Sequence, residues 1–164
     1  GASVELVHFE DREIKLKNAL EPLRENYDYI LIDCPPSLGI LTLNALMASD
    51  EVVIPVQCEY YALEGLGQLL ETIDLLKTHL GAKLIIKGAI LTMFDRRNRL
   101  SREIVKEMRR NFPGYVFEAV IPRNVCLAEA PSFSKTILQH DPYSHGAKAY
   151  RQLTEEILKL DSKQ

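Results

Sequence analysis

The sequence lacks the paired cysteines of a disulfide-stabilised protein or a zinc ribbon. It has three cysteines, Cys34, Cys58 and Cys126, with no C-x-x-C spacing among them. It also lacks a signal peptide and any run of about 18 consecutive apolar residues, the length that a membrane-spanning helix needs. These absences favour a protein of the reducing cytosol with no membrane partner.

An excess of positive charge is missing as well. The 164 residues include 20 Lys and Arg against 23 Asp and Glu, which gives a formal net charge of −3. A protein whose whole surface binds nucleic acid would be basic, so such binding would need a local patch here. The length suits a single domain, and we expect residues 1–164 to form one.

Apolar runs and amphipathic stretches alternate along the chain. The apolar runs do not alternate with polar residues, which is typical of strands buried on both faces. Together these patterns predict a doubly wound α/β fold, with a mostly parallel sheet between layers of helices. Ligands of such sheets bind at the carboxyl ends of the strands. The expected strands are 28–33, 51–57, 84–94 and 115–122, and the expected helices are 11–25, 40–48, 62–79, 101–112 and about 146–160.

The first strand end is Asp33, in the stretch YDYILIDCPPSLG at 27–39. A lone carboxylate at a strand tip can hold Mg²⁺ through its water shell beside a nucleotide phosphate. Pro35 and Pro36 fix two φ angles, so the following turn is pre-shaped and suits a segment that senses a γ-phosphate. The alternative is a strand terminator whose Asp caps the next helix.

The third expected strand leads into a basic segment. Between Asp95 and Arg110 there are seven basic residues against three acidic ones, a local charge of +4. We expect Ser101 to cap the helix that starts there. This charge suits contacts with phosphate backbones without base recognition, and the alternative is an ordinary solvated helix face. The basic residues expected on one face of the helix are Arg102, Lys106 and Arg109.

The other two strand ends give weaker signals. Glu59, Tyr60 and Tyr61 follow the second strand, and they form either the acidic start of a helix or a face that meets a partner protomer. Pro122 and Asn124 close a tight loop after the fourth strand. The Asn side chain offers a donor and an acceptor that could recognise an adenine edge.

Taken in order, the strand ends resemble the ParA/Soj family of chromosome and plasmid partition ATPases. The stretches that carry this resemblance are YDYILIDCPPSLG, VIPVQCEYYALEGLGQLL, LTMFDRRNRLS and IPRNVCLAEAPS, and it extends from about Val4 to Leu160. The resemblance implies a P-loop NTPase fold with ATP and Mg²⁺ as cofactors. It also implies an ATP-dependent homodimer that binds DNA without sequence preference, a ParB-like partner that stimulates hydrolysis, and a cytoplasmic, nucleoid-associated protein.

The resemblance further implies roles for individual residues. Asp33 matches the Walker B aspartate, a catalytic residue that would hold Mg²⁺ through water. Arg97 matches an arginine implicated in DNA binding. The residues that would lie near the adenine are Thr92, Met93, Pro122 and Asn124.

The chain departs from the family pattern in two ways. Cys126 stands where a second DNA-binding arginine usually lies, so we expect weaker DNA binding, for which Arg96, Arg99 and Arg102 could compensate. The Gly-rich P-loop of the K-G-G-x-G-K-T type, with its phosphate-binding lysine and the lysine that reaches across the dimer, is not found in the sequence. We therefore expect the N-terminally truncated, C-terminal part of such an ATPase, inactive alone, with an open sheet edge that destabilises it or pairs with another copy.

Two other functions stay open at this stage. The chain could be a non-catalytic module that binds DNA or a ParB-like protein. It could also be a MinD-like positioning ATPase that associates with membranes. The mixed charges of the last expected helix, among them Glu155, Glu156 and Lys159, argue against a basic membrane-surface helix.

Overall fold

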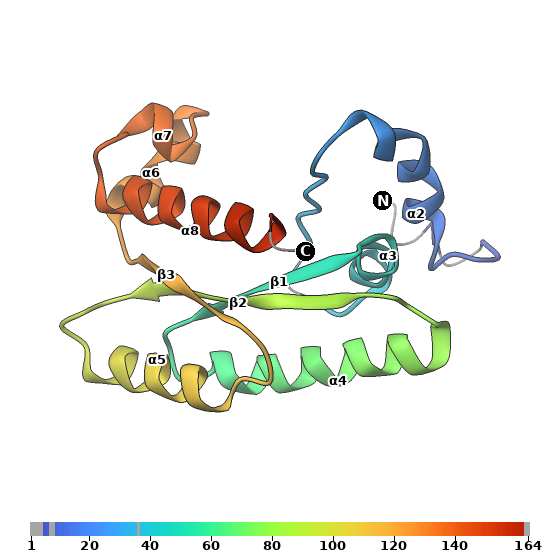
Figure 1. Cartoon of the computed structure of the whole chain (residues 1–164), viewed down its shortest axis with the longest axis horizontal. Helices are drawn as coiled ribbons and strands as arrows, with labels where there is room; N and C mark the ends of the chain where they lie inside the picture. The colour runs from blue at the N-terminus through green and yellow to red at the C-terminus, as the bar shows by residue number, and fades with distance from the viewer. Residues whose placement is uncertain (1–4, 7–8, 36, 163–164) are drawn as a thin grey trace. The chain divides into compact units, whose positions relative to one another are not determined.

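Figure 1 shows the computed structural model, which describes residues 5–6, 9–35 and 37–162. The chain divides into two compact units. The first comprises Gly1–Val52 and Gly65–Ile86, and the second comprises Val53–Glu64 and Lys87–Gln164. The single domain expected from the sequence stays a prediction. Among the helices of the described residues, none is both long enough and apolar enough to cross a membrane.

A parallel sheet forms the centre of the second unit. Strand β2 lies between β1 and β3, and β2 and β3 run parallel. The Ile85 N–H donates to the Asp50 carbonyl, and the Cys58 N–H donates to the Thr92 carbonyl, so β1 runs beside β2 in the same direction. The expected parallel α/β sheet is confirmed, and three of its strands form within one residue of the expected bounds: β1 (Glu51–Gln57), β2 (Ile85–Phe94) and β3 (Val116–Pro122).

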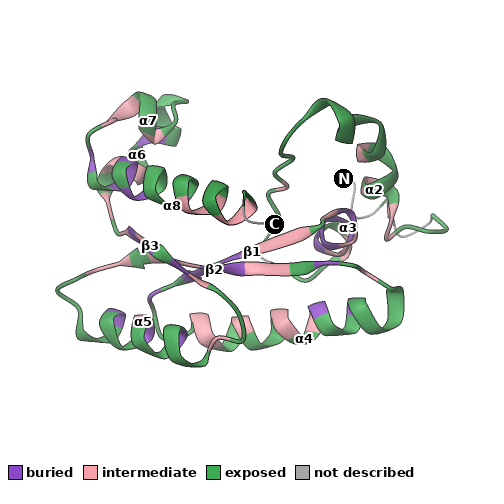
Figure 2. Cartoon of the chain, viewed as in Figure 1, coloured by how far each residue is buried: buried purple, intermediate pink, exposed green. Residues whose placement is uncertain are grey.

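Helices cover both faces of this sheet. α5 (Arg99–Asn111) and α8 (His145–Asp161) lie on opposite sides of the strands (Figure 1). α5 buries Ile104 and Met108, as its apolar pattern predicts. α8 packs on β3, where the buried cluster contains Phe117, Ala119, Ile121, Ala149 and Leu153. Figure 2 shows that buried positions are concentrated in the strands, while most of the outer helix surface is exposed.

Strand β3 contains an irregular stretch. Between the pairs Ala89–Val116 and Leu91–Val120, β3 advances by four residues while β2 advances by two. Extra residues of this kind leave main-chain groups without a partner in the neighbouring strand. A side chain from another element therefore has to satisfy these groups if they are shielded from water.

Glu156 of α8 supplies that partner. Its carboxylate accepts the N–H groups of Glu118 and Ala119 at 2.8 and 3.0 Å and the Tyr115 hydroxyl at 2.5 Å. Partial burial of Glu156 opposes its ionisation, but these three hydrogen bonds outweigh burial and hold its pKa below the ordinary value. The same contact raises the pKa of Tyr115 to about 12.

The first unit contains a pair of packed helices. α2 (Lys15–Leu20) packs against α3 (Ile40–Ala48), and the buried Asn44 of α3 joins the two. Its side-chain oxygen accepts the Leu16 N–H at 3.1 Å, and its amide nitrogen donates to the Arg12 carbonyl at 2.7 Å. The remaining helical elements before β3 are the 3-10 helix η1 (Glu21–Asn26) and α4 (Ala62–Leu80). Those after β3 are α6 (Val125–Glu129), η2 (Ala130–Phe133) and α7 (Ile137–His140).

The helix expected over 11–25 is shorter than its sequence pattern suggests. The α-helical part spans only Lys15–Leu20, and a 3-10 helix with a proline in its first turn continues the chain. Pro22 has no N–H to donate to a carbonyl four residues earlier, so the α-helical hydrogen-bond pattern ends before it. The helices expected at 40–48 and 62–79 form with nearly the same bounds.

The strand expected at 28–33 is wrong. Residues 27–35 have no regular secondary structure, and the side chain of Leu31 is 93% exposed. Tyr29 and Ile30 are exposed as well. A strand needs a neighbour for its main-chain donors and acceptors, and within the described residues the sheet consists of β1, β2 and β3 alone. Residues 28–33 therefore have the apolar pattern of a strand but no neighbouring strand to pair with.

The contact of Glu156 predicts a pH-dependent contribution to stability. We expect Glu156→Gln to lower the free energy of unfolding at pH 7 by about 1–2 kcal/mol, because an amide accepts the three hydrogen bonds less strongly than a carboxylate. Since the folded pKa is lowered, this contribution is complete above the ordinary Glu pKa of about 4.3 and is lost as the pH falls through the folded value. Urea unfolding at several pH values measures it.

Glu155→Gln is the matched control, because Glu155 is the exposed neighbour on the same helix. It should leave the free energy of unfolding nearly unchanged. Equal stability of the Glu156→Gln variant and the wild type at pH 7 would show that the carboxylate does not support β3.

Candidate functional site

The carboxyl end of β2 contains a strained bulge. Between the pairs Leu91–Val120 and Phe94–Pro122, β2 advances by three residues while β3 advances by two. Met93 lies in this bulge with a φ of 54°, a left-handed conformation that is uncommon for a residue with a side chain. Such strain is found preferentially at functional sites, where a bulge re-aims side chains at the sheet edge.

The loops after β1 and β3 are joined by an ion pair. The Arg123 Nη2 atom lies 2.5 Å from the Glu59 Oε1 atom, and the Arg123 N–H donates to the Phe94 carbonyl at 2.9 Å. About half of each charged side chain is exposed, so water screens the pair and its contribution to stability is small. Its effect is positional, because it links the ends of the two outer strands across the end of β2.

Asn124 follows directly and caps α6. Its side-chain oxygen accepts the Leu127 N–H at 3.3 Å. Among the described residues its amide nitrogen has no hydrogen-bond partner, so its two donors remain for a ligand. The structure thus brings together, at the ends of the paired strands β2 and β3, the four residues that the family resemblance implies lie near the adenine: Thr92, Met93, Pro122 and Asn124. Their role in binding stays a prediction.

Asp33 belongs to the first unit and ends the irregular apolar segment there. It is exposed, and it lines a cavity of about 420 Å³ together with Pro35, Leu41 and other residues of the same unit. It does not cap the next helix, because the N-cap of α3 is Gly39. Among the described residues its carboxylate has no hydrogen-bond partner, and its role in binding Mg²⁺ stays a prediction.

The turn after Asp33 is held against α3. The buried Thr42 hydroxyl donates to the Ser37 carbonyl at 2.6 Å and lies 3.4 Å from the Pro35 carbonyl. The side chains of α3 therefore shape this turn in addition to its proline. Pro36, the second proline of the predicted pre-shaped turn, lies outside the described residues.

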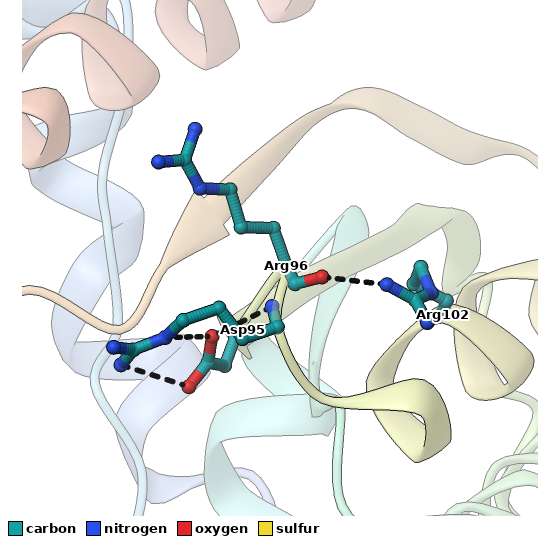
Figure 3. Close-up of polar contacts among 4 residues, drawn as sticks. Asp95, Arg96 and Arg102 are labelled. Atoms are coloured by element: carbon teal, nitrogen blue, oxygen red, sulfur yellow. Dashed lines mark hydrogen bonds and ion pairs between the residues drawn. The ribbon is translucent and has the colours of Figure 1, made fainter.

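The basic segment starts with a tight turn at residues 95–98. Asp95 accepts the Arg97 main-chain N–H at 2.9 Å and the Arg97 Nε–H at 3.3 Å. On the other side of the turn, the Arg102 guanidinium donates to the Arg96 carbonyl at 2.8 Å (Figure 3). The turn is therefore held by one acidic and one basic side chain.

The helix after this turn begins earlier than expected. Its N-cap is Asn98, whose side-chain oxygen accepts the Leu100 N–H at 2.9 Å. The prediction that Ser101 is the cap is wrong, because an extended Asn98 takes this place first. Ser101 is instead buried in the first turn of the helix, where its hydroxyl donates to the Cys58 carbonyl at 3.1 Å and ties α5 to the end of β1.

The three basic residues predicted to share one face of α5 differ in their contacts within the chain. Arg102 is bonded to the turn, and the Arg109 Nη2 atom lies 3.0 Å from the Glu118 carboxylate. Lys106 is exposed and has no ion pair within the described residues. Two further exposed cations, Arg96 and Arg110, are equally without an ion pair there. From the sequence, Arg96 was named only as a residue that could compensate for Cys126, and Arg110 was only counted in the basic segment. Only contacts in three dimensions show which charges are neutralised.

Tyr60 and Tyr61 stay candidates for a face that meets a partner. Their rings meet edge to face, with centroids 5.4 Å apart, and the two side chains are 71% and 79% exposed. Glu59 does not belong to the first turn of α4, which carries Glu64 instead.

Comparison with known proteins gives three findings. Residues 1–86 match the model of a family described as an AAA domain. The sporulation initiation inhibitor protein Soj of Bacillus subtilis is 56% identical over 157 residues, which cover 96% of this chain and 62% of Soj. The chromosome partitioning protein ParA of Myxococcus xanthus is 54% identical over 162 residues, which cover 99% of this chain and 57% of ParA.

Among solved structures, cobyrinic acid a,c-diamide synthase from Mycobacterium smegmatis, with bound ADP and magnesium, superimposes with a TM-score of 0.78. The two are 35% identical, and the match covers 97% of this chain and 58% of the synthase. The chain therefore spans about six tenths of the length of the proteins it matches.

The strain at Met93 can be measured. We expect Met93→Gly to be more stable than Met93→Ala by about 1 kcal/mol, because glycine adopts a positive φ without the penalty that a Cβ atom brings. Both variants remove the same side chain beyond Cβ, so the alanine variant serves as the control for lost contacts. Urea unfolding of the two gives the difference, and a more stable alanine variant would contradict a left-handed Met93.

Proposed function

Because this chain belongs to the ParA/Soj family of partition ATPases, we propose that it acts in chromosome or plasmid partitioning and contributes the nucleic-acid contact and the adenine side of the nucleotide site. The observation that carries the proposal is the arrangement at one edge of the sheet. The end of β2 leads from a strained bulge directly into a turn and helix with exposed cations, while the adjacent end of β3 presents Asn124.

In the proposed nucleotide site, the chain's own residues bind and orient. Asn124 donates to the base edge, and the bulge at Met93 shapes the neighbouring contact surface. As a separate proposal for the first unit, Asp33 would hold Mg²⁺ through its water shell. The sequence has no Gly-rich loop whose N–H groups cradle phosphates, so we propose that this chain alone contacts the base and does not hydrolyse ATP.

In the proposed nucleic-acid contact, the cations bind phosphates without reading bases. Arg96, Lys106 and Arg110 are exposed and have no ion pair within the described residues, so their charges can face a polyanion at full strength. The segment's charge of +4 contrasts with the chain's −3, which favours contacts with phosphates.

The family resemblance adds partners to the proposal. A homodimer would form with ATP, a ParB-like protein would stimulate hydrolysis, and the DNA-bound form would be associated with the nucleoid. The exposed pair of Tyr60 and Tyr61, at the same sheet edge, suits a protein contact because aromatic residues are enriched in interfaces. A second candidate is a non-catalytic module that binds DNA or a ParB-like protein; the exposed cations without an ion pair favour it, and it differs in needing no nucleotide.

Mg-ATP binding tests whether the residues of this chain form a complete nucleotide site. We expect titration calorimetry of this chain to show no binding at micromolar Mg-ATP, because contacts to the base alone leave the phosphates uncradled. Circular dichroism establishes that the chain is folded. Clear binding that Asn124→Ala abolishes would contradict this expectation and show that the site is complete without a Gly-rich loop.

DNA binding tests the cationic surface. In fluorescence titrations of a short duplex at several salt concentrations, we expect Lys106→Ala or Arg110→Ala to reduce the slope of log affinity against log salt by about 0.9. Lys159→Ala is the control, since Lys159 is an exposed lysine of α8, on the opposite face of the sheet. An equal loss for Lys159→Ala would show that only net charge matters.

A further inference from the structure

Arg97 differs from Arg96, the other cation of the turn, because an acidic side chain holds it. The Asp95 carboxylate contacts the Arg97 main-chain N–H at 2.9 Å, the Nε atom at 3.3 Å and the Nη2 atom at 3.5 Å. The Arg97 side chain is 87% exposed and that of Asp95 is 30% exposed. Arg97 therefore lies on the surface while the edge formed by Nε and Nη2 faces its own chain.

That edge is the one that binds a phosphate best. Arginine recognises phosphates and carboxylates through two parallel N–H groups, and here Asp95 occupies such a pair. The carboxylate also cancels the charge of the guanidinium, so a phosphate that approaches Arg97 meets a neutral pair. An exposed ion pair of this kind is weak, and a phosphate can displace it.

Arg96, the neighbouring cation of the turn, is not restrained by an acidic side chain in this way. The Arg102 guanidinium bonds to the Arg96 carbonyl and so holds the backbone of the turn, while the Arg96 side chain points away from Asp95 (Figure 3). The main-chain hydrogen bond from Arg97 is the largest cause that holds the pKa of Asp95 below its ordinary value, and Arg123 adds to it. Asp95 is thus ionised at neutral pH, while Arg123 is itself paired with Glu59.

We propose that Asp95 sets the strength of nucleic-acid binding by competing with backbone phosphates for Arg97. The inference rests on the proposed nucleic-acid contact and names a residue that regulates it. In the free protein Arg97 is held by Asp95, and on binding it exchanges the carboxylate for a phosphate. The need to displace the carboxylate weakens DNA binding. It also makes the affinity less dependent on salt concentration, because part of the charge of Arg97 is already neutralised in the free protein.

The test is the isosteric variant Asp95→Asn. The asparagine oxygen still accepts the Arg97 main-chain N–H and preserves the turn, but the negative charge is gone. We expect the affinity for a short DNA duplex to rise about twofold to fivefold, the range that loss of an exposed ion pair allows. The salt slope should steepen by up to about 0.9, the share of one additional phosphate contact.

A double-variant cycle shows whether the effect passes through Arg97. Arg97→Ala should weaken binding, and Asp95→Asn should give no gain in the Arg97→Ala background. A gain that persists there would mean that only net charge matters, and it would overturn the inference. Reduced affinity of Asp95→Asn would overturn it too, since Asp95 would then orient Arg97 for binding.

Two further outcomes separate the inference from the function on which it rests. Binding by the wild type with no change in Asp95→Asn overturns the inference alone. No binding by the wild type at low salt overturns the proposed nucleic-acid contact, and the inference with it. Should Asp95→Asn fail to fold by circular dichroism, Asp95→Ser, which also retains an acceptor for the Arg97 N–H, takes its place in the same cycle.

Discussion

Main-chain pairing between parallel strands is the constraint on which this structure depends. β2 has a partner on each side, so its strand ends and those of β1 and β3 meet at one edge of the sheet. Because the connecting helices lie on the faces, this edge stays open, and the loops that follow the strands gather there. Every feature of the proposed site in the second unit, from the bulge at Met93 to the basic turn, follows from that placement.

The departures from regular pairing are as informative as the pairing itself. At one place in β3 the extra residues expose main-chain N–H groups, and Glu156 of α8 accepts them. At the end of β2 the extra residue turns Met93 into a left-handed conformation and aims the chain into the basic segment. The main-chain groups at the first irregularity are satisfied by a side chain that supports the fold, whereas the second irregularity is strained and lies at the proposed nucleotide site.

Charge in the basic segment is distributed by local contacts. The segment has the composition of a phosphate-binding surface, but several of its arginines have partners within the chain. Arg97, Arg99 and Arg109 are paired with Asp95, Glu103 and Glu118, and Arg102 holds the turn. Exposed side chains without such contacts carry their full charge toward solvent. A basic run is therefore better judged by which cations lack internal partners than by its net charge.

Sequence alone determined the helices, whose hydrogen bonds form within a few residues, and the strands that pair with the next strand in the sequence. It determined α3, the three strands of the sheet and, through four motifs, the family, because periodicity and motif spacing are local properties. Tertiary structure decided the rest. The apolar run at 28–33 stays irregular, since a strand exists only with a neighbour, and the partners of Arg97 and Glu156 depend on side chains that meet in space.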